Sequence, residues 1–282
     1  MPDVKYGIVL PYGSARQAAD LAQLAEEAGW DGVFMGDAIW CEDPLIRLTA
    51  AAMTTKQIRL GTMVIPAPLR SPWTLASQSL ALDMLSEGRL ILGLGVGATW
   101  MGWSSFPGLV MDTKGRAEIL DETIDILTQM FQRKQFDYDG KHFKIQLSTM
   151  DPQHYPPASF QQPRVPIWIP GVWKKQKSMQ RILKCDGFFP VCMDAEGKFV
   201  DLTPAALQDM KAYIDANRTA TGPFDIVVEG RVLRLDPGEA QDKLGAWVGA
   251  GMTWWVESTW EETEEGIREL IRKGPLVLET RP

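Results

Sequence analysis

The sequence has few of the side chains on which metal, disulfide or nucleophilic chemistry depends. Its 282 residues include two histidines, His142 and His154, and three cysteines, Cys41, Cys185 and Cys192. Both histidines lie in one polar segment, so they cannot build a histidine-rich site elsewhere and we expect no metal centre. The cysteines show no regular spacing that would indicate a disulfide framework, and free thiols are typical of a reducing cytoplasm.

The sequence also lacks an excess of positive charge and any long apolar run. Lysine and arginine number 29 against 36 acidic residues, a formal net charge of −7. This disfavours a nucleic-acid partner, because phosphate backbones need clustered cations. No run of about 18 apolar residues occurs, so we expect no membrane span, and the first apolar stretch is too short for a signal peptide. We expect a cytoplasmic protein that acts on a small-molecule substrate.

A repeated pattern is present instead, in which an amphipathic helix ends at glycine and a short apolar run follows. Residues 25–37, 85–97, 183–191 and 248–258 all follow it. Glycine supplies the left-handed residue after a helix, and an uninterrupted apolar run suits a strand buried on both faces. Helices that alternate with such strands form right-handed βαβ units in a parallel sheet.

Eight apolar strand segments alternate with helical segments along the chain, which favours a TIM-type (β/α)8 barrel of the α/β class over an open, doubly wound sheet. Such a barrel takes about 250 residues, so we expect one domain over residues 1–282. The expected strands are 6–10, 32–36, 58–64, 90–95, 165–169, 187–191, 225–232 and 253–257. The expected helices are 15–28, 43–54, 72–86, 115–133, 174–184, 204–218, 238–249 and 261–273.

Residues 134–164 interrupt the alternation between the fourth helix and the fifth strand. This insertion is polar and rich in proline, and Asp139-Gly140 indicates the turn of a small hairpin. Insertions in a barrel often lie over the mouth and shape substrate access. A passive surface loop is the alternative.

The expected barrel mouth is poor in reactive side chains. Catalysis in such barrels takes place at the carboxyl ends of the strands, where this sequence places no histidine, no lysine and no serine with a histidine partner. That argues against metal, Schiff-base and serine-nucleophile chemistry. Glycines, aromatic rings and a few acids suit an enzyme whose cofactor carries the hard chemistry. They are equally compatible with a barrel that binds a ligand without turnover.

Two acids at strand ends are candidates for a direct role. Asp37 follows the second strand and Glu257 closes the eighth, and either could bind a cofactor hydroxyl or act as acid or base. The alternatives are that Asp37 caps the next segment and Glu257 pairs with an arginine. Tryptophans after strand ends could wall a flat cofactor or an apolar substrate, or pack beneath loops: Trp40, Trp100, Trp103, Trp173 and Trp260. Trp40 joins the two acids as a candidate catalytic residue.

The fourth strand ends in a glycine-rich segment. Gly95, Val96 and Gly97 lie within and just after the strand, without the spacing of a dinucleotide-binding motif that opens a helix. Glycines here let a flat ring approach the backbone, or they form a tight turn at the strand end.

A lysine-bearing segment follows the fifth strand. Helix N-termini and lysines bind phosphate, although lysines also occupy solvated helix faces. The candidate cofactor-binding residues of this segment are Pro170, Gly171, Val172, Lys174, Lys175 and Ser178.

Several segments together resemble the luciferase-like monooxygenases and their coenzyme F420-dependent relatives. These are residues 61–72 (GTMVIPAPLRSP), 85–97 (LSEGRLILGLGVG), 163–171 (PRVPIWIPG) and 185–190 (CDGFFP), with Arg116 and Glu118 opening the fourth helix. The similarity extends over essentially the whole chain and is specific as a set.

The resemblance implies a barrel with an insertion after the fourth helix, usually a homodimer. It implies reduced FMN, or alternatively F420, at the mouth, with its phosphate near strands four and five. A cis peptide bond between Met63 and Val64 would support the ring. We expect a monooxygenase that uses O2 on a small organic substrate and can depend on a separate flavin reductase. Hydride transfer with F420 is the alternative, and a non-catalytic flavin-binding barrel is a second one.

The sequence departs from this family at three places. Ala38 follows Asp37 where many F420-dependent members carry histidine, and Ala98 and Thr99 replace an acid after the glycines of strand four. No histidine lies at a strand end, whereas luciferase has one near its flavin. The missing histidine favours FMN over F420.

Overall fold

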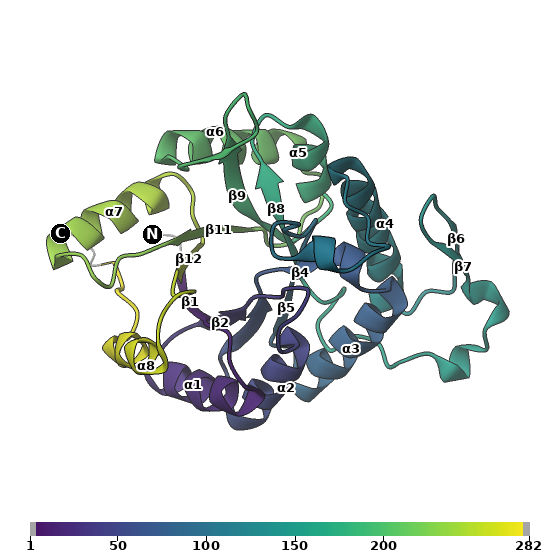
Figure 1. The fold of residues 1–282 in the computed structure, drawn as a ribbon, viewed down its shortest axis with the longest axis horizontal. Helices are drawn as coiled ribbons and strands as arrows, with labels where there is room; N and C mark the ends of the chain where they lie inside the picture. Colours follow the sequence, from purple (N-terminus) through teal and green to yellow (C-terminus); the bar gives the residue numbers. More distant parts are fainter. Residues whose placement is uncertain (1–3, 279–282) are drawn as a thin grey trace.

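Eight parallel strands form a closed barrel in the computed structural model, which describes residues 4–278 (Figure 1). β1 pairs with both β2 and β12, and β8 joins β5 to β9, so the ring of strands is complete. The barrel strands are β1 (Lys5–Leu10), β2 (Gly32–Met35), β3 (Arg59–Thr62), β5 (Leu90–Gly95), β8 (Ile167–Val172), β9 (Gly187–Met193), β11 (Asp225–Gly230) and β12 (Trp254–Glu257). The predicted barrel and its eight strands are confirmed.

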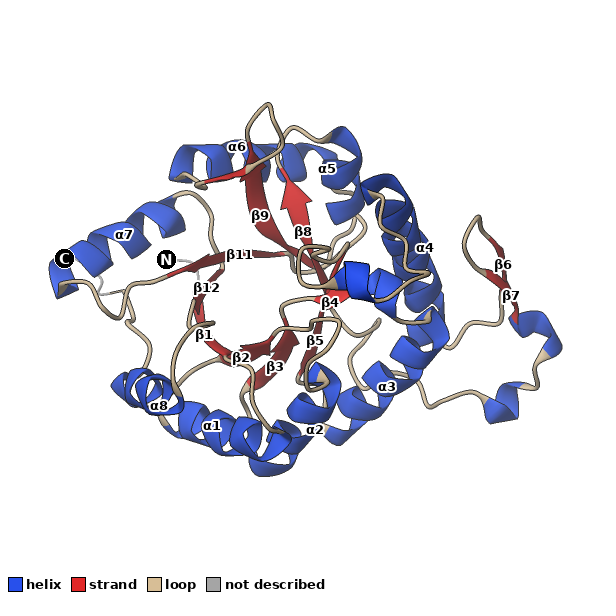
Figure 2. Cartoon of the chain, viewed as in Figure 1, coloured by secondary structure: helices blue, strands red, loops and turns tan. Residues whose placement is uncertain are grey.

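A ring of helices surrounds the strands (Figure 2). Proline occupies the first turn of four of them, where a missing N–H costs nothing; at α2 the Asp43 side chain accepts hydrogen bonds from Leu45 N and Ile46 N. The helices are α1 (Ala15–Glu27), α2 (Pro44–Thr54), α3 (Pro72–Leu85), α4 (Thr113–Phe131), α5 (Gln176–Ile182), α6 (Pro204–Asn217), α7 (Pro237–Gly249) and α8 (Glu264–Lys273).

Two helices differ in extent from the prediction. α5 starts at Gln176 and has seven residues, because Lys174 has a φ of 62° and cannot continue a right-handed helix. α8 starts at Glu264, because the Thr263 side chain accepts from Gly266 N and caps the helix there. Short elements complete the chain: β4 (Ile65–Pro66), β10 (Phe199–Val200), and the 3-10 helices η1 (Ala67–Leu69), η2 (Trp103–Ser105), η3 (Leu147–Thr149) and η4 (Pro152–His154).

The insertion contains the predicted hairpin, formed by β6 (Asp137–Asp139) and β7 (Lys144–Gln146). Its tip is held against α4, where Glu122 accepts hydrogen bonds from the backbone N–H groups of residues 141–143, and the Phe143 ring lies 6.1 Å from that of Trp73 on α3. In Figure 1 the hairpin lies outside α4, beside the barrel wall. We expected the insertion over the mouth, but these contacts place it along the outer surface of α3 and α4.

Large aromatic side chains fill the inside of the barrel. Phe34, Trp168 and Trp254 are buried together, with ring centroids 5.5 to 5.7 Å apart. Glycine on neighbouring strands leaves room for them: a Cβ at Gly61 would overlap the Phe34 ring, and one at Gly32 would lie 2.9 Å from the Trp254 ring. The interior is therefore a packed core, and ligands bind at its mouth. No helix within residues 4–278 is long and apolar enough to cross a membrane.

Candidate active site

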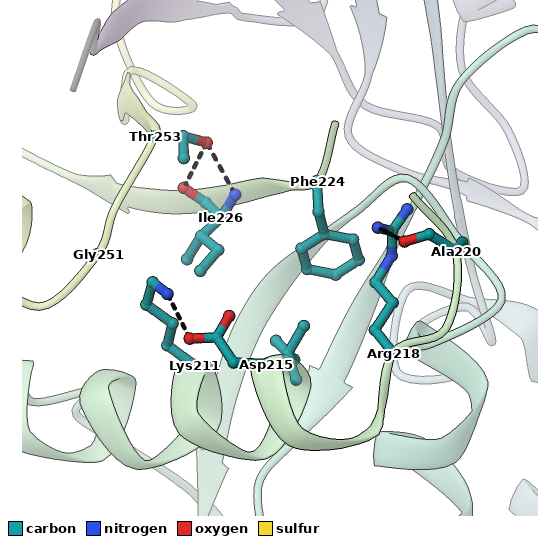
Figure 3. A pocket seen from close by; sticks show the side chains of 9 residues that line it. Lys211, Asp215, Arg218, Ala220, Phe224, Ile226, Gly251 and Thr253 are labelled. Carbon is teal, nitrogen blue, oxygen red and sulfur yellow. Dashed lines mark hydrogen bonds and ion pairs between the residues drawn. The ribbon is translucent and has the colours of Figure 1, made fainter. Parts of the chain in front are cut away.

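The structure contains cavities at both ends of the barrel. Figure 3 shows one of about 280 Å³, in which Phe224 precedes β11, Thr253 precedes β12, and Lys211 and Asp215 of α6 form an ion pair. This cavity lies at the amino ends of the strands. Barrel enzymes place their chemistry at the carboxyl ends, so the active site is expected at the opposite end.

A larger cavity of about 550 Å³ opens at the carboxyl ends of β5 and β8, between α4 and α5. Its apolar wall includes Val96, Pro170 and Val172, and Thr113 and Ser178 contribute hydroxyl groups. A volume of roughly 300–1,000 Å³ with a few polar groups is typical of small-molecule sites. The structure thus brings residues predicted after the fourth and fifth strands into one cavity.

Lysines are the most numerous charged side chains around this cavity, and one of them, Lys114, lies 3.9 Å from Glu118. Lys114, Lys175 and Lys177 line it. Its acids have cationic partners: Asp121 pairs with Arg181 at 2.5 Å, and Glu118 with Lys141 at 2.6 Å. The hydrogen bond from Lys141 holds the pKa of Glu118 below its ordinary value. A cavity with cations at its edge and neutralised acids fits an anionic ligand.

Other residues of the lysine segment have different places. Lys174 is exposed and does not line the cavity, and the Ser178 hydroxyl already accepts a 2.9 Å hydrogen bond from Val172 N. The α carbon of Gly171 faces the barrel wall, where a Cβ would lie 2.8 Å from Phe188. α5 has seven residues and begins at Gln176, so Lys175 is its N-cap residue and Lys174 precedes the helix.

The peptide bond between Met63 and Val64 is cis, as the resemblance implied. Both residues pack against the barrel's inner aromatic cluster at the edge of the mouth. The protein's own atoms occupy the space beside the nearby glycines. A Cβ at Gly95 would lie 2.7 Å from Val64, and one at Gly97, whose φ is 80°, would overlap the Trp103 ring. The positive φ of Gly97 agrees with a tight turn at the end of the strand.

Asp37 is locked into an ion pair. Its carboxylate lies 2.7 Å from Nη2 of Arg70, whose Nη1 lies 2.7 Å from Asp43. Only 4% of the Asp37 side chain is exposed. Burial raises the pKa of Asp37, and Arg70 opposes that shift. Asp37 does not cap the next segment, as the structural alternative supposed, because the N-cap of α2 is Asp43.

Glu257 faces away from the mouth. It is 3% exposed and accepts hydrogen bonds from Val232 N, Leu233 N and the indole of Trp255. Burial raises the pKa of Glu257, and these hydrogen bonds oppose the shift. The expectation that Glu257 lies at the mouth is therefore wrong. Side chains alternate along a strand, and because Val256 points into the barrel, Glu257 points outward. Its contacts are backbone and indole N–H groups and not the expected arginine.

The five tryptophans do not form one rim. Trp103 is buried under the guanidinium of Arg116, and Trp173 packs against Tyr213. Trp40 is 86% exposed, and Trp100 is exposed beside Phe199. Trp260 alone packs against the inner cluster.

One acid at the mouth escaped the sequence analysis. Glu229 of β11 accepts a 2.6 Å hydrogen bond from the indole of Trp260. The alternation of side chains along β11 could have indicated it. Val227 points into the barrel, so Glu229, two residues further on, points to the same side. Among residues 4–278, no group of three or more histidine, cysteine, aspartate or glutamate side chains could hold a metal ion.

Comparisons with known proteins identify the family of this barrel. A Mycobacterium tuberculosis protein named as a coenzyme F420-dependent oxidoreductase is 31% identical over 67% of this chain and 55% of its own length. The oxygenase component of a flavin-dependent trigonelline monooxygenase from Acinetobacter baylyi is 28% identical over 53% of this chain and 41% of its own length. The matches thus span about half the length of these relatives.

A solved structure shares the fold. An F420-dependent secondary alcohol dehydrogenase in complex with an F420–acetone adduct superposes with a TM-score of 0.76 at 13% identity, over 98% of this chain and 100% of that one. The family model for luciferase-like monooxygenases matches residues 4–275. With that match over nearly all of the described barrel, the chain belongs to the luciferase-like monooxygenase family.

Proposed function

We propose that the chain is an oxidoreductase that binds reduced FMN in the cavity between α4, β8 and α5. The observation that carries this proposal is the cavity of about 550 Å³ with Lys114, Lys175 and Lys177 at its edge. An apolar wall suits a flavin ring, and the lysines suit its phosphate. The named flavin-dependent relative supports the same conclusion.

The residues of the chain have distinct tasks in this proposal. Bound reduced flavin supplies electrons to O2 or to a substrate, and the protein binds, orients and shields it. Val96, Pro170 and Val172 would contact the apolar part of the cofactor, and the lysines would hold its phosphate. Met63 and Val64 would support the ring from the edge of the mouth, since they pack on the inner cluster.

Coenzyme F420 is the second candidate for the same cavity. It also carries a flat ring and negative charge, and a relative matched over 67% of this chain is named as F420-dependent. In that case the enzyme transfers hydride to or from a small organic substrate, and O2 plays no part.

A separate flavin reductase would supply the reduced FMN, and the name of the Acinetobacter relative, an oxygenase component, supports such a partner.

We also propose a homodimer in the cytoplasm. α2 and α3 expose apolar side chains side by side, with Ile46 and Met53 on α2 and Met84 and Leu85 on α3. A groove between the two helices is lined by Leu45, Ile46, Ala81 and Leu85 among others. A second copy would cover this face.

Titration of the purified protein tests the cofactor. FMN and F420, each oxidised and reduced, are added separately while ligand and tryptophan fluorescence are recorded. We expect saturable binding of FMN, and O2 consumption when reduced FMN is present. Preference for F420 would instead support the second candidate, an enzyme that transfers hydride to or from a small organic substrate. Binding of FMN without any turnover would support the non-catalytic barrel, and binding of neither cofactor would overturn the proposal.

A further inference from the structure

The strand alternation identifies one charged side chain that faces the mouth. Val227 of β11 packs in the inner cluster with Phe34 and Trp254, so Glu229, two residues further on, faces the same side nearer the mouth. In the parallel register Glu229 is level with Val256 of β12, and the next inward positions after β2 and β12 hold the uncharged residues Gly36 and Ser258. The alternation of β11 therefore turns the carboxylate of Glu229 toward the mouth.

This carboxylate has no cationic partner. Its Oε1 accepts the hydrogen bond from Trp260 Nε1, and no ion pair involves Glu229 anywhere in residues 4–278. Arg231 and Arg234, which follow on the same segment, point to Glu261 and Glu262 instead. The side chain of Glu229 is exposed. Its negative charge is thus open to a ligand that enters the mouth.

Two aromatic rings stand beside this charge. The Trp260 ring lies over Gly36, where a Cβ would be 2.7 Å from it, and the ring of Tyr12 lies 6.5 Å from that of Trp260. The hydrogen bond to Glu229 fixes the orientation of the indole. Aromatic faces together with a carboxylate attract organic cations, because both present negative potential.

The location of this group complements that of the cofactor cavity. The cavity opens at β5 and β8, whereas Tyr12 follows β1 and Trp260 follows β12. Around the ring of eight strands, the junction of β12 and β1 lies opposite that of β5 and β8. A ligand held by Glu229 would therefore face the cofactor from across the mouth.

We propose that Glu229, Trp260 and Tyr12 form a substrate subsite for a positively charged organic group, such as an alkylammonium. The proposal rests on the proposed function, since it assigns this ligand as the substrate of the oxidoreductase. It narrows the substrate class to small organic cations.

Binding of three matched probes tests the subsite. Benzylammonium, benzyl alcohol and benzoate share one ring and differ in charge. They are titrated into the full-length protein with 15N-labelled tryptophan, and the Trp260 indole resonance is assigned with Trp260→Phe. We expect benzylammonium to shift this resonance and to bind about tenfold more tightly than benzoate, because the carboxylate of Glu229 attracts the ammonium group and repels the carboxylate of benzoate. Glu229→Gln should remove the preference, whereas Glu261→Gln, the same change on the exposed neighbouring loop, should retain it.

Three outcomes would overturn the subsite: no binding of benzylammonium, equal binding of benzoate, or an unchanged preference in Glu229→Gln. FMN and F420 titrations of the same samples separate this result from the proposed function. Cofactor binding without probe binding overturns the subsite alone. If benzylammonium binds with the expected preference but neither FMN nor F420 binds, the cation site is supported and the proposed oxidoreductase function is overturned.

Discussion

Arg70 binds Asp37 through two nitrogens, Nε at 3.2 Å and Nη2 at 2.7 Å from the same carboxylate oxygen. The third nitrogen, Nη1, lies 2.7 Å from Asp43, whose other oxygen caps α2. One guanidinium thus connects the ends of β2 and β4 to the start of α2. Asp37 therefore has a structural role, although it lies at the carboxyl end of a strand, where catalytic residues of barrels are found.

Removal of the guanidinium should destabilise the fold. Arg70→Met leaves Asp37 buried without its cation, so we expect the free energy of unfolding to fall by about 3 kcal/mol in urea denaturation. Arg268→Met, which breaks an ion pair with Glu264 on the surface of α8, should cost less than about 1 kcal/mol. Equal losses in the two variants would show that Asp37 is not locked by Arg70.

Glu257 should give stability a defined pH dependence. Because its pKa in the folded protein is raised above the ordinary value of 4.5, the folded state retains a proton that the unfolded state has released. The contribution of this group to the free energy of unfolding therefore declines as pH rises from about 4.5 to the folded-state pKa, and is constant above it.

Glu257→Gln removes this titration and replaces one acceptor oxygen by an NH2 group, so either the indole of Trp255 or the backbone N–H groups lose their acceptor, at a cost of about 1–3 kcal/mol. Urea unfolding of both proteins from about pH 4 to about pH 7 measures the difference. We expect the advantage of the wild type to be largest at acid pH and to narrow as pH rises. A difference that stays constant across this range contradicts the raised pKa.

The cavity lysines should act on the phosphate of the cofactor. Lys175→Glu combined with Lys177→Glu should weaken FMN binding by at least about tenfold, because two attractive charges become repulsive. Riboflavin, which lacks the phosphate, should bind both proteins with similar affinity in the same fluorescence titration. Lys56→Glu, an exposed change at the amino end of β3, is the control. An equal loss of riboflavin binding would mean that the lysines do not recognise phosphate.

Packing of the barrel core makes Gly61 sensitive to the smallest side chain. Gly61→Ala would drive a methyl group into the Phe34 ring, and overpacking of this kind costs about 1–3 kcal/mol. Gly245→Ala lies on α7 with nothing within 4 Å of the added carbon and should stabilise by about 0.5–1 kcal/mol. Thermal unfolding of the wild type and both variants measures these changes in stability. A neutral Gly61→Ala would show that the core can move to make room.

The exposed apolar face on α2 and α3 predicts a specific effect on assembly. Met53 is 69% exposed, and Met53→Asp would place a charge in the proposed dimer contact, where its burial is unfavourable. We expect sedimentation velocity to show a dimer for the wild type and a monomer for the variant. Val200→Asp, a similar change on β10 far along the chain, should leave the dimer intact. A monomeric wild type would contradict the proposal.

The candidate site was only partly predictable. The strand ends were located correctly, and residues from the fourth and fifth of them, Val96, Pro170, Val172 and Lys175, meet in one cavity. Lys114 lies in the same cavity but belongs to α4, and nothing in its local sequence indicates this. The roles of the acids were harder to infer, because consecutive side chains on a strand point to opposite faces of the sheet, and an error of one residue exchanges the inside of the barrel for the outside. Glu229 faces the mouth, whereas Glu257 binds backbone amides outside it.

The barrel was predictable from local sequence features, because periodic helices, glycine stops and doubly buried apolar runs repeat along the chain. It also indicated the hairpin at Asp139-Gly140 and the family. Which charges are neutralised depends on contacts between residues far apart in the sequence. Arg70 reaches Asp37 from 33 residues away, and Glu122 holds the insertion from 21 residues away. Such pairs depend on where whole elements pack, which no local pattern encodes.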